Sequence, residues 1–143
     1  DRARSRGAVA DFLIKFMVPG SNSDPVCESG EVSRNDWIKW AEHHWSDIRE
    51  TDTLNVAEGR SEEDTKHICP LQLPVIRRLV KLFSDPGEIV FSPFTGIGSE
   101  GFVSLQQNRR FYGCEIKPEY FEVANRNCER AIAERVDQLE LFV

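Results

Sequence analysis

The sequence predicts an α/β protein in which parallel strands alternate with helices, and this prediction rests on residues 67–143. Two short apolar runs, Glu88–Phe91 and Phe111–Glu115, have the length and the β-branched or aromatic content of strands. A helical pattern follows each run, at Ser99–Gln107 and at Pro118–Arg135. Since a strand–helix–strand order in one sheet calls for a right-handed crossover, the two strands are expected to be parallel.

Two further elements belong to this α/β part. Pro74–Phe83 has apolar residues at helical intervals and a proline at its start, which favours an amphipathic helix. Leu139–Val143 is predicted to be a third strand. Arg109 and Arg110 belong to the turn before the second strand, and we expect both to be solvated.

Residues 1–66 are richer in loops, and we treat them as a separate part of the chain. Ala8–Val18 is predicted to be a strand, because it is apolar and ends at a Pro-Gly pair. Asp36–Ile48 has the apolar spacing of a helix, with Ser33 or Asn35 as its cap. Its apolar stripe, predicted to pack into the core, consists of Trp37, Trp40, Trp45 and Ile48.

The composition is that of a water-soluble globular chain. No apolar run approaches the length of a membrane span, and four widely spaced cysteines without a C-x-x-C pair argue against a zinc ribbon or a disulfide framework. Reduced thiols and the lack of a signal-peptide pattern predict a cytoplasmic location. His43 and His44 have no Cys or Asp at ligand spacing, so no metal site is expected. The net charge of −6 does not favour nucleic-acid binding, although a local basic patch can bind phosphate.

The stretch FSPFTGIGSEG at residues 91–101 follows the first predicted strand. Gly96 and Gly98 lie where parallel strands bind ligands, but the stretch matches neither the dinucleotide fingerprint nor the phosphate loop. Glu115 ends the next strand, where a carboxylate can accept hydrogen bonds from a ribose. Together they indicate an adenosine compound bound without its phosphates, such as S-adenosylmethionine. The alternative is a tight strand-to-helix turn with a solvent-facing Glu115.

Three segments in fixed order carry a family resemblance. They are His67–Pro74 (HICPLQLP), then Ser92–Ser99 (SPFTGIGS) shortly after Pro86-Gly87, then Arg109–Tyr120 (RRFYGCEIKPEY). In this order they resemble the carboxy-terminal half of DNA amino-methyltransferases of the adenine-N6 or cytosine-N4 type, which prophages and restriction–modification systems encode. The resemblance implies a Rossmann-like, S-adenosyl-L-methionine-dependent methyltransferase fold.

The resemblance also implies cofactor-binding roles. Residues 67–71 are expected to approach the methionine end of S-adenosyl-L-methionine, and residues 92–99 to surround its amino-acid and sulfonium region. Glu115 is expected to bind the ribose, and Ile116 the adenine. The implied cofactor residues are His67, Cys69, Pro70, Leu71, Ser92, Pro93, Phe94, Thr95, Gly96, Gly98, Ser99, Glu115 and Ile116.

The chain departs from the family pattern at two positions. Ser92 stands where the family usually has Asp, and Leu73 stands where it often has Lys. An Asp can meet the ammonium group of the cofactor, whereas a serine keeps a hydrogen-bonding oxygen but has no charge. We expect the chain to bind the cofactor nevertheless.

The family's catalytic tetrapeptide, D/N/S-P-P followed by an aromatic residue, does not occur in the sequence. Ser92-Pro93-Phe94 is only superficially similar, so no catalytic residue is assigned. The expected interpretation is a fragment whose front half is missing and which is inactive alone, with residues 21–65 in the target-recognition region. Double-stranded DNA, the front half, and a second copy bound at an exposed sheet edge are its expected partners. A non-catalytic remnant or binding module, or a Rossmann-like protein with another adenosine ligand, remain as alternatives.

Overall fold

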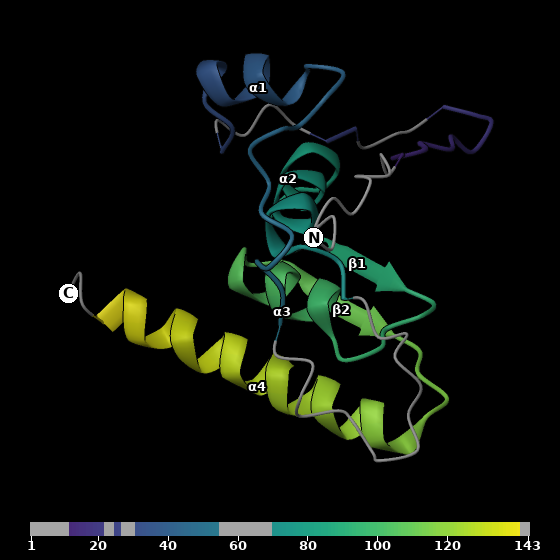
Figure 1. Cartoon of the computed structure of the whole chain (residues 1–143), viewed down its shortest axis with the longest axis vertical. Helices are drawn as coiled ribbons and strands as arrows, with labels where there is room; N and C mark the ends of the chain where they lie inside the picture. Colours follow the sequence, from purple (N-terminus) through teal and green to yellow (C-terminus); the bar gives the residue numbers. More distant parts are fainter. Residues whose placement is uncertain (1–11, 22–24, 27–30, 55–69, 141–143) are drawn as a thin grey trace, which may run out of the picture.

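A computed structural model describes residues 12–21, 25–26, 31–54 and 70–140, with nothing described of the side chains beyond residue 137 (Figure 1). The elements are α1 (Arg34–Trp40), α2 (Leu73–Phe83), β1 (Ile89–Ser92), α3 (Ser99–Gln106), β2 (Arg110–Gly113) and α4 (Pro118–Glu140). Over these ranges, the chain contains no helix with the length and apolar character needed to cross a bilayer.

The two strands form a parallel sheet, in register from Ile89 opposite Arg110 to Ser92 opposite Gly113. Helix α3 makes the crossover between them and packs against α2 on one side and α4 on the other (Figure 1). The predicted α/β class and the parallel arrangement are therefore confirmed. The predicted start and end of each helix and strand from Pro74 to Arg135 differ by at most two residues from the observed ones, except that α4 continues to Glu140.

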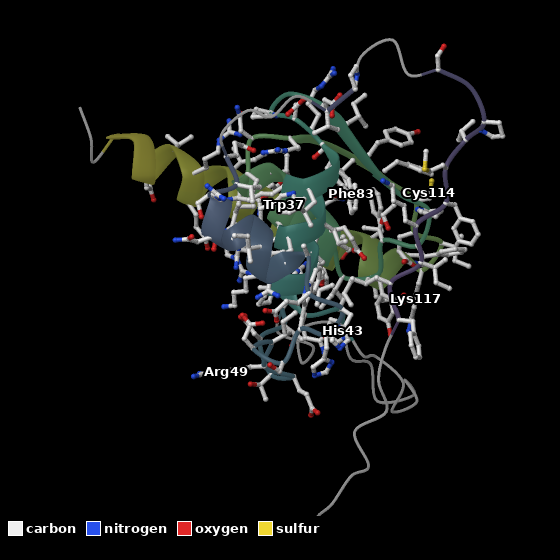
Figure 2. All side chains as sticks on the ribbon, turned by 90° about the horizontal axis from the view of Figure 1, so that it is seen from above. Trp37, His43, Arg49, Phe83, Cys114 and Lys117 are labelled. Carbon is white, nitrogen blue, oxygen red and sulfur yellow. The ribbon has the colours of Figure 1, made fainter. Side chains whose placement is uncertain are left out.

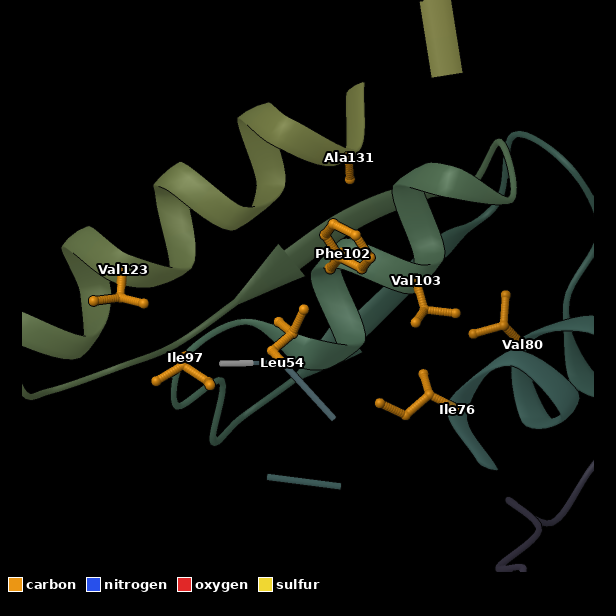
Figure 3. Close-up of a cluster of buried hydrophobic side chains, with 8 residues drawn as sticks. All are labelled: Leu54, Ile76, Val80, Ile97, Phe102, Val103, Val123 and Ala131. Atoms are coloured by element: carbon orange, nitrogen blue, oxygen red, sulfur yellow. The ribbon is translucent and has the colours of Figure 1, made fainter. Parts of the chain in front are cut away.

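The hydrophobic core is centred on α3. Figure 3 shows how side chains from α2, the loop after β1, α3 and α4 converge, together with one residue that precedes α2. The core residues are Leu54, Ile76, Val80, Ile97, Phe102, Val103, Val123 and Ala131. Because Leu54 joins this cluster and the amide of Leu73 donates to the carbonyl of Asp52, the segment that ends at residue 54 is attached to the α/β part.

The sheet has one covered face and one open face. Val90 on β1 is half-buried against the core, whereas its neighbours Ile89 and Phe91 are 58% and 56% exposed. Tyr112 on β2 is also exposed, and its ring stacks on Phe91 with 5.9 Å between centroids. The alternation along a strand explains this pattern, because successive side chains point to opposite faces.

Two predicted strands are wrong where the structure describes them. Leu139 belongs to the last turn of α4, because no glycine or proline stops the helix after Arg135. Residues 12–18 of the predicted strand Ala8–Val18 have no regular secondary structure and pair with no described strand. Apolar composition alone does not make a strand, since the backbone groups need a neighbouring strand to pair with. Residues 8–11 and 141–143 lie outside the described part.

The tryptophan helix is shorter than predicted. It begins at Arg34 and ends at Trp40, with Ser33 Oγ accepting from the amide of Asp36 at 3.1 Å, which confirms Ser33 as the cap. Residues 41–48 form turns, and the indole of Trp45 donates to the carbonyl of Trp40 at 3.0 Å. None of the helix is buried and Trp37 is 58% exposed, so the prediction of a core stripe is wrong.

Arg109 was expected to be solvated, and this expectation is wrong. Its side chain is fully buried, and its guanidinium donates to the carbonyl and hydroxyl of Ser84 and to the carbonyl of Gln107. The Glu31 carboxylate lies 2.7 Å from the same guanidinium. Arg109 therefore connects the turn before β2 to the start of residues 31–54, which we call the Trp segment. Arg110 is exposed, as predicted.

Candidate functional site

The loop between β1 and α3 depends on two glycines for different reasons. Gly96 and Gly98 both have left-handed backbones, with φ of 54° and 87°. A Cβ added at Gly98 would lie 2.9 Å from the Cα of Ala124, so this glycine lets the loop approach α4. A Cβ at Gly96 would meet nothing within 4 Å. Gly96 is half-buried, and the side on which a Cβ would lie is open space that a ligand could enter.

Hydrogen bonds connect this loop to the end of β2 beyond the sheet itself. The amide of Cys114 donates to the carbonyl of Ser92, and the amide of Thr95 donates to the carbonyl of Cys114, both at 2.9 Å. The amide of Gly96 donates to Oε2 of Glu115 at 2.8 Å. These three bonds hold the loop against the residues that follow β2.

Glu115 is half-buried, and both of its oxygens accept backbone bonds. Oε2 accepts from Gly96, and Oε1 accepts from the amide of Lys117 at 2.9 Å. The carboxylate is thus fixed in position instead of facing solvent freely. Because each carboxylate oxygen has two lone pairs, Glu115 can still accept further hydrogen bonds. Its role toward a ribose stays a prediction.

Five of the predicted site residues line two different cavities. Leu71, Ser92 and Pro93 line a cavity of about 780 Å³ that runs along α2 and β1. Thr95 and Glu115 line a cavity of about 230 Å³ between β2 and α4.

The remaining predicted residues that the structure describes line neither cavity. Phe94 and Ile116 are 86% and 98% exposed, so their side chains are free to meet a ligand or a partner. Gly98 and Ser99 are buried at the start of α3, and Pro70 is half-buried. His67 and Cys69 lie outside the described residues.

Sequence reasoning missed one residue of the larger cavity, Glu100. It is the second residue of α3 and the only carboxylic acid among the described residues that line this cavity. Burial raises the pKa of the Glu100 carboxyl, and a bond with its own backbone opposes this shift. Its position directly after the glycine loop is the signal that could have identified it.

Sequence reasoning also missed a polar contact that we call the Arg78 clasp. Arg78 is buried on α2, its guanidinium lies 2.6 Å from Asp47, and the rings of Trp40 and Trp45 lie 5.6 and 4.9 Å from it. The bond from Arg78, and a second from Lys39, hold the pKa of the Asp47 carboxyl well below its usual range. The clasp attaches the Trp segment to the α/β part, while His43 and Arg49 project from its turns (Figure 2).

The cysteines and histidines do not form a metal centre in the part of the chain that the structure describes. Cys114 is exposed beside the glycine loop. Cys128 on α4 is half-buried, and burial raises the pKa of its thiol. The raised pKa of the Cys128 thiol does not favour a reactive nucleophile at this position.

The fold and the site define a Rossmann-like α/β unit, with a glycine turn and an acidic residue at the carboxyl ends of parallel strands. The family model described as DNA methylase, N6_N4_Mtase, matches residues 21–126. The chain therefore belongs to the N6/N4 DNA methylase family.

Individual relatives agree with this assignment. Type II methyltransferase M.BglI of Bacillus subtilis is 30% identical over 130 residues, which cover 89% of this chain and 33% of M.BglI. Type II methyltransferase M.BglII, also of Bacillus subtilis, is 45% identical over 65 residues, which cover 44% of this chain and 18% of M.BglII. The chain thus spans a third or less of the length of these relatives.

A solved structure shows the same fold. TTHA0409 of Thermus thermophilus, complexed with S-adenosyl-L-methionine, matches with a TM-score of 0.59 at 24% sequence identity. The match covers 90% of this chain and 50% of TTHA0409.

Proposed function

We propose that this chain is the S-adenosylmethionine-binding part of a DNA methyltransferase that modifies adenine N6 or cytosine N4. The observation that carries the proposal is the glycine loop held against Glu115, with open space where a Cβ of Gly96 would lie. Membership of the DNA methylase family and the similarity to M.BglI support it. The cofactor-bound state of TTHA0409, which has the same fold, supports the choice of cofactor.

The residues present fit an adenosine ligand without phosphates. Glu115 has an oriented carboxylate with acceptor capacity left for ribose hydroxyls, and Ile116 offers an exposed apolar side chain for the adenine. Leu71, Ser92 and Pro93 share a cavity that would take the methionine end. The assignments of His67, Cys69 and Pro70 remain predictions from the resemblance.

When bound, S-adenosylmethionine supplies an activated methyl group, and the residues of this chain orient the cofactor. The sequence does not contain the catalytic tetrapeptide. We therefore propose that the chain alone does not methylate DNA. Double-stranded DNA is its partner in the complete enzyme, in which a flipped base presents its exocyclic amine.

The edge of β1 that does not face β2 could pair with a further strand. Among the described strands β1 pairs with β2 alone, and all four of its residues line the larger, mainly apolar cavity. An unpaired strand edge is a template for another strand. We propose that a strand of the front half occupies it, and that self-association through the same edge replaces this pairing when the front half is absent. A monomer by light scattering would contradict the self-association.

Calorimetric titration of the full chain with S-adenosylmethionine tests the cofactor assignment. Binding is expected, and Glu115→Gln is expected to weaken it by about tenfold because a charge-assisted bond is lost. Glu119→Gln, an exposed acid four residues away, is the matched control and should bind like the unmodified chain. Absence of heat at millimolar cofactor would show that the proposed function is wrong.

Methyl transfer from radiolabelled cofactor to unmethylated DNA separates the two catalytic alternatives. We expect no transfer by this chain alone, and transfer once it is joined to an upstream segment that contains the tetrapeptide. A joined protein that binds cofactor and DNA without transfer would favour the non-catalytic binding module.

A further inference from the structure

A carboxylic acid lines the larger cavity beside the loop that follows β1. This acid, Glu100, shares the cavity with Ser92 and Pro93, two of the residues expected to surround the amino-acid end of the cofactor. Ser92 is 8% exposed and carries no charge. Any negative charge on this part of the wall, among the described residues, therefore comes from Glu100.

Among the described residues, no cation neutralises the charge of Glu100. No ion pair joins it to another described residue. Lys15 is the only lysine or arginine among the described residues that line the cavity, and its ammonium lies over the ring of Phe83, 4.7 Å from the centroid.

Burial has a direct effect on this carboxyl group. It raises the pKa of Glu100, because a desolvated carboxylate is less stable than a solvated one. A cation brought into the cavity would reverse this effect by favouring the charged form. The site is thus suited to a ligand that carries a positive group at this point.

We propose that Glu100 binds the ammonium group of the methionine moiety of S-adenosylmethionine, and that it supplies the negative charge that Ser92 lacks. This proposal rests on the proposed function. It makes Glu100 a cofactor-binding residue that the glycine loop and Glu115 do not account for.

A purely structural role for Glu100 makes a different prediction. An acid in the first turn stabilises a helix by meeting the partial positive charge of its N-terminus. Glu119 has the same position in α4, where it is exposed. Glu119→Gln is therefore a matched control for the helix-end effect.

Two ligands that differ only in the ammonium group provide the test. S-adenosylhomocysteine and its des-amino analogue are titrated calorimetrically into the full chain, into Glu100→Gln and into Glu119→Gln. The unmodified chain and Glu119→Gln should prefer S-adenosylhomocysteine by about tenfold, as expected for a charge-assisted hydrogen bond. Glu100→Gln should lose this preference and keep its affinity for the des-amino analogue, and adding Ser92→Asp should restore it.

The outcomes that overturn the proposal are distinct. Equal affinity of the unmodified chain for both ligands would overturn it without any variant. An unchanged preference for S-adenosylhomocysteine in Glu100→Gln would overturn it. An equal loss of affinity for both ligands would also overturn it, because such a loss indicates a structural role. Failure of the unmodified chain to bind any adenosyl ligand, S-adenosylmethionine included, would instead remove the proposed function on which it rests.

Discussion

The Trp segment, residues 31–54, and the α/β part, residues 70–137, are held in place by different forces. The α/β part packs α2, α3 and α4 around apolar side chains, of which Val103 and Ala131 are fully buried. In the Trp segment only Leu54 is buried, and the part of the segment before residue 52 is attached through Arg78 and Arg109. Apolar packing spreads stability over many contacts, whereas the Trp segment relies on two cations, on Leu54 and on the backbone bond between Asp52 and Leu73.

The first way to test this comparison is to disturb the close packing of the α/β part. Gly98→Ala should destabilise the chain by about 2–4 kcal/mol, since a left-handed alanine is strained and its Cβ would overlap with Ala124. Gly96→Ala is the control, because it has the same strain without the overlap and should cost about 1–2 kcal/mol. Urea unfolding measures both, and equal losses would show that packing against α4 is unimportant.

A smaller loss is expected in the Trp segment. Trp45→Ala removes a half-buried ring that faces Arg78 and an indole bond to Trp40, and should cost about 2 kcal/mol. Trp37→Ala removes an exposed ring and should change stability by less than about 0.5 kcal/mol. Thermal unfolding measures both variants. Equal losses of stability in Trp37→Ala and Trp45→Ala would contradict the prediction that the ring facing Arg78 is the one that attaches the segment.

Removing the charge of Asp47, the acidic partner in the Arg78 clasp, is expected to have the smallest effect on stability, and this effect should depend on pH. Asp47→Asn should cost about 1 kcal/mol at neutral pH, a modest value because Asp47 is 35% exposed. Since the folded-state pKa of Asp47 is below its ordinary 3.8, its contribution is present above about pH 4 and is lost as the pH falls further.

The measurement is urea unfolding of the unmodified chain and the variant at neutral and acid pH. The stability difference between them should shrink as the pH falls below about 4. Glu50→Gln, an exposed acid of the same segment, is the control and should show no such difference. A difference that stays constant down to about pH 2 would contradict the role of the Asp47 charge.

The same contrast explains what could be predicted from the sequence. Apolar periodicity and proline or glycine punctuation located α2, β1, α3 and β2, because in the α/β part packing follows local pattern. Arg78 and Arg109 were unpredictable, since a buried arginine depends on partners 31 and 78 residues away, Asp47 and Glu31. The spacing of the tryptophans predicted a helix through residue 48, but a turn after Trp40 brings two of the rings onto Arg78 instead.

The candidate site was predictable only in part for a similar reason. The glycines and Glu115 were found because their order along the chain is informative. The position of Glu100 after the glycine loop places it near the site, but it was missed because its importance comes from the cavity that it lines, and the sequence does not show which side of a helix faces a cavity.

The bonds from Cys114, Thr95 and Gly96 give the loop a rigidity that a free turn would lack. A ligand that lands on a loop already fixed in place loses little conformational entropy of the protein on binding. The amide hydrogens of these three residues should therefore exchange with solvent as slowly as those of the sheet, before any cofactor is added. The loop between β1 and α3 would then be a preorganised extension of the sheet, with the same conformation before and after the cofactor binds.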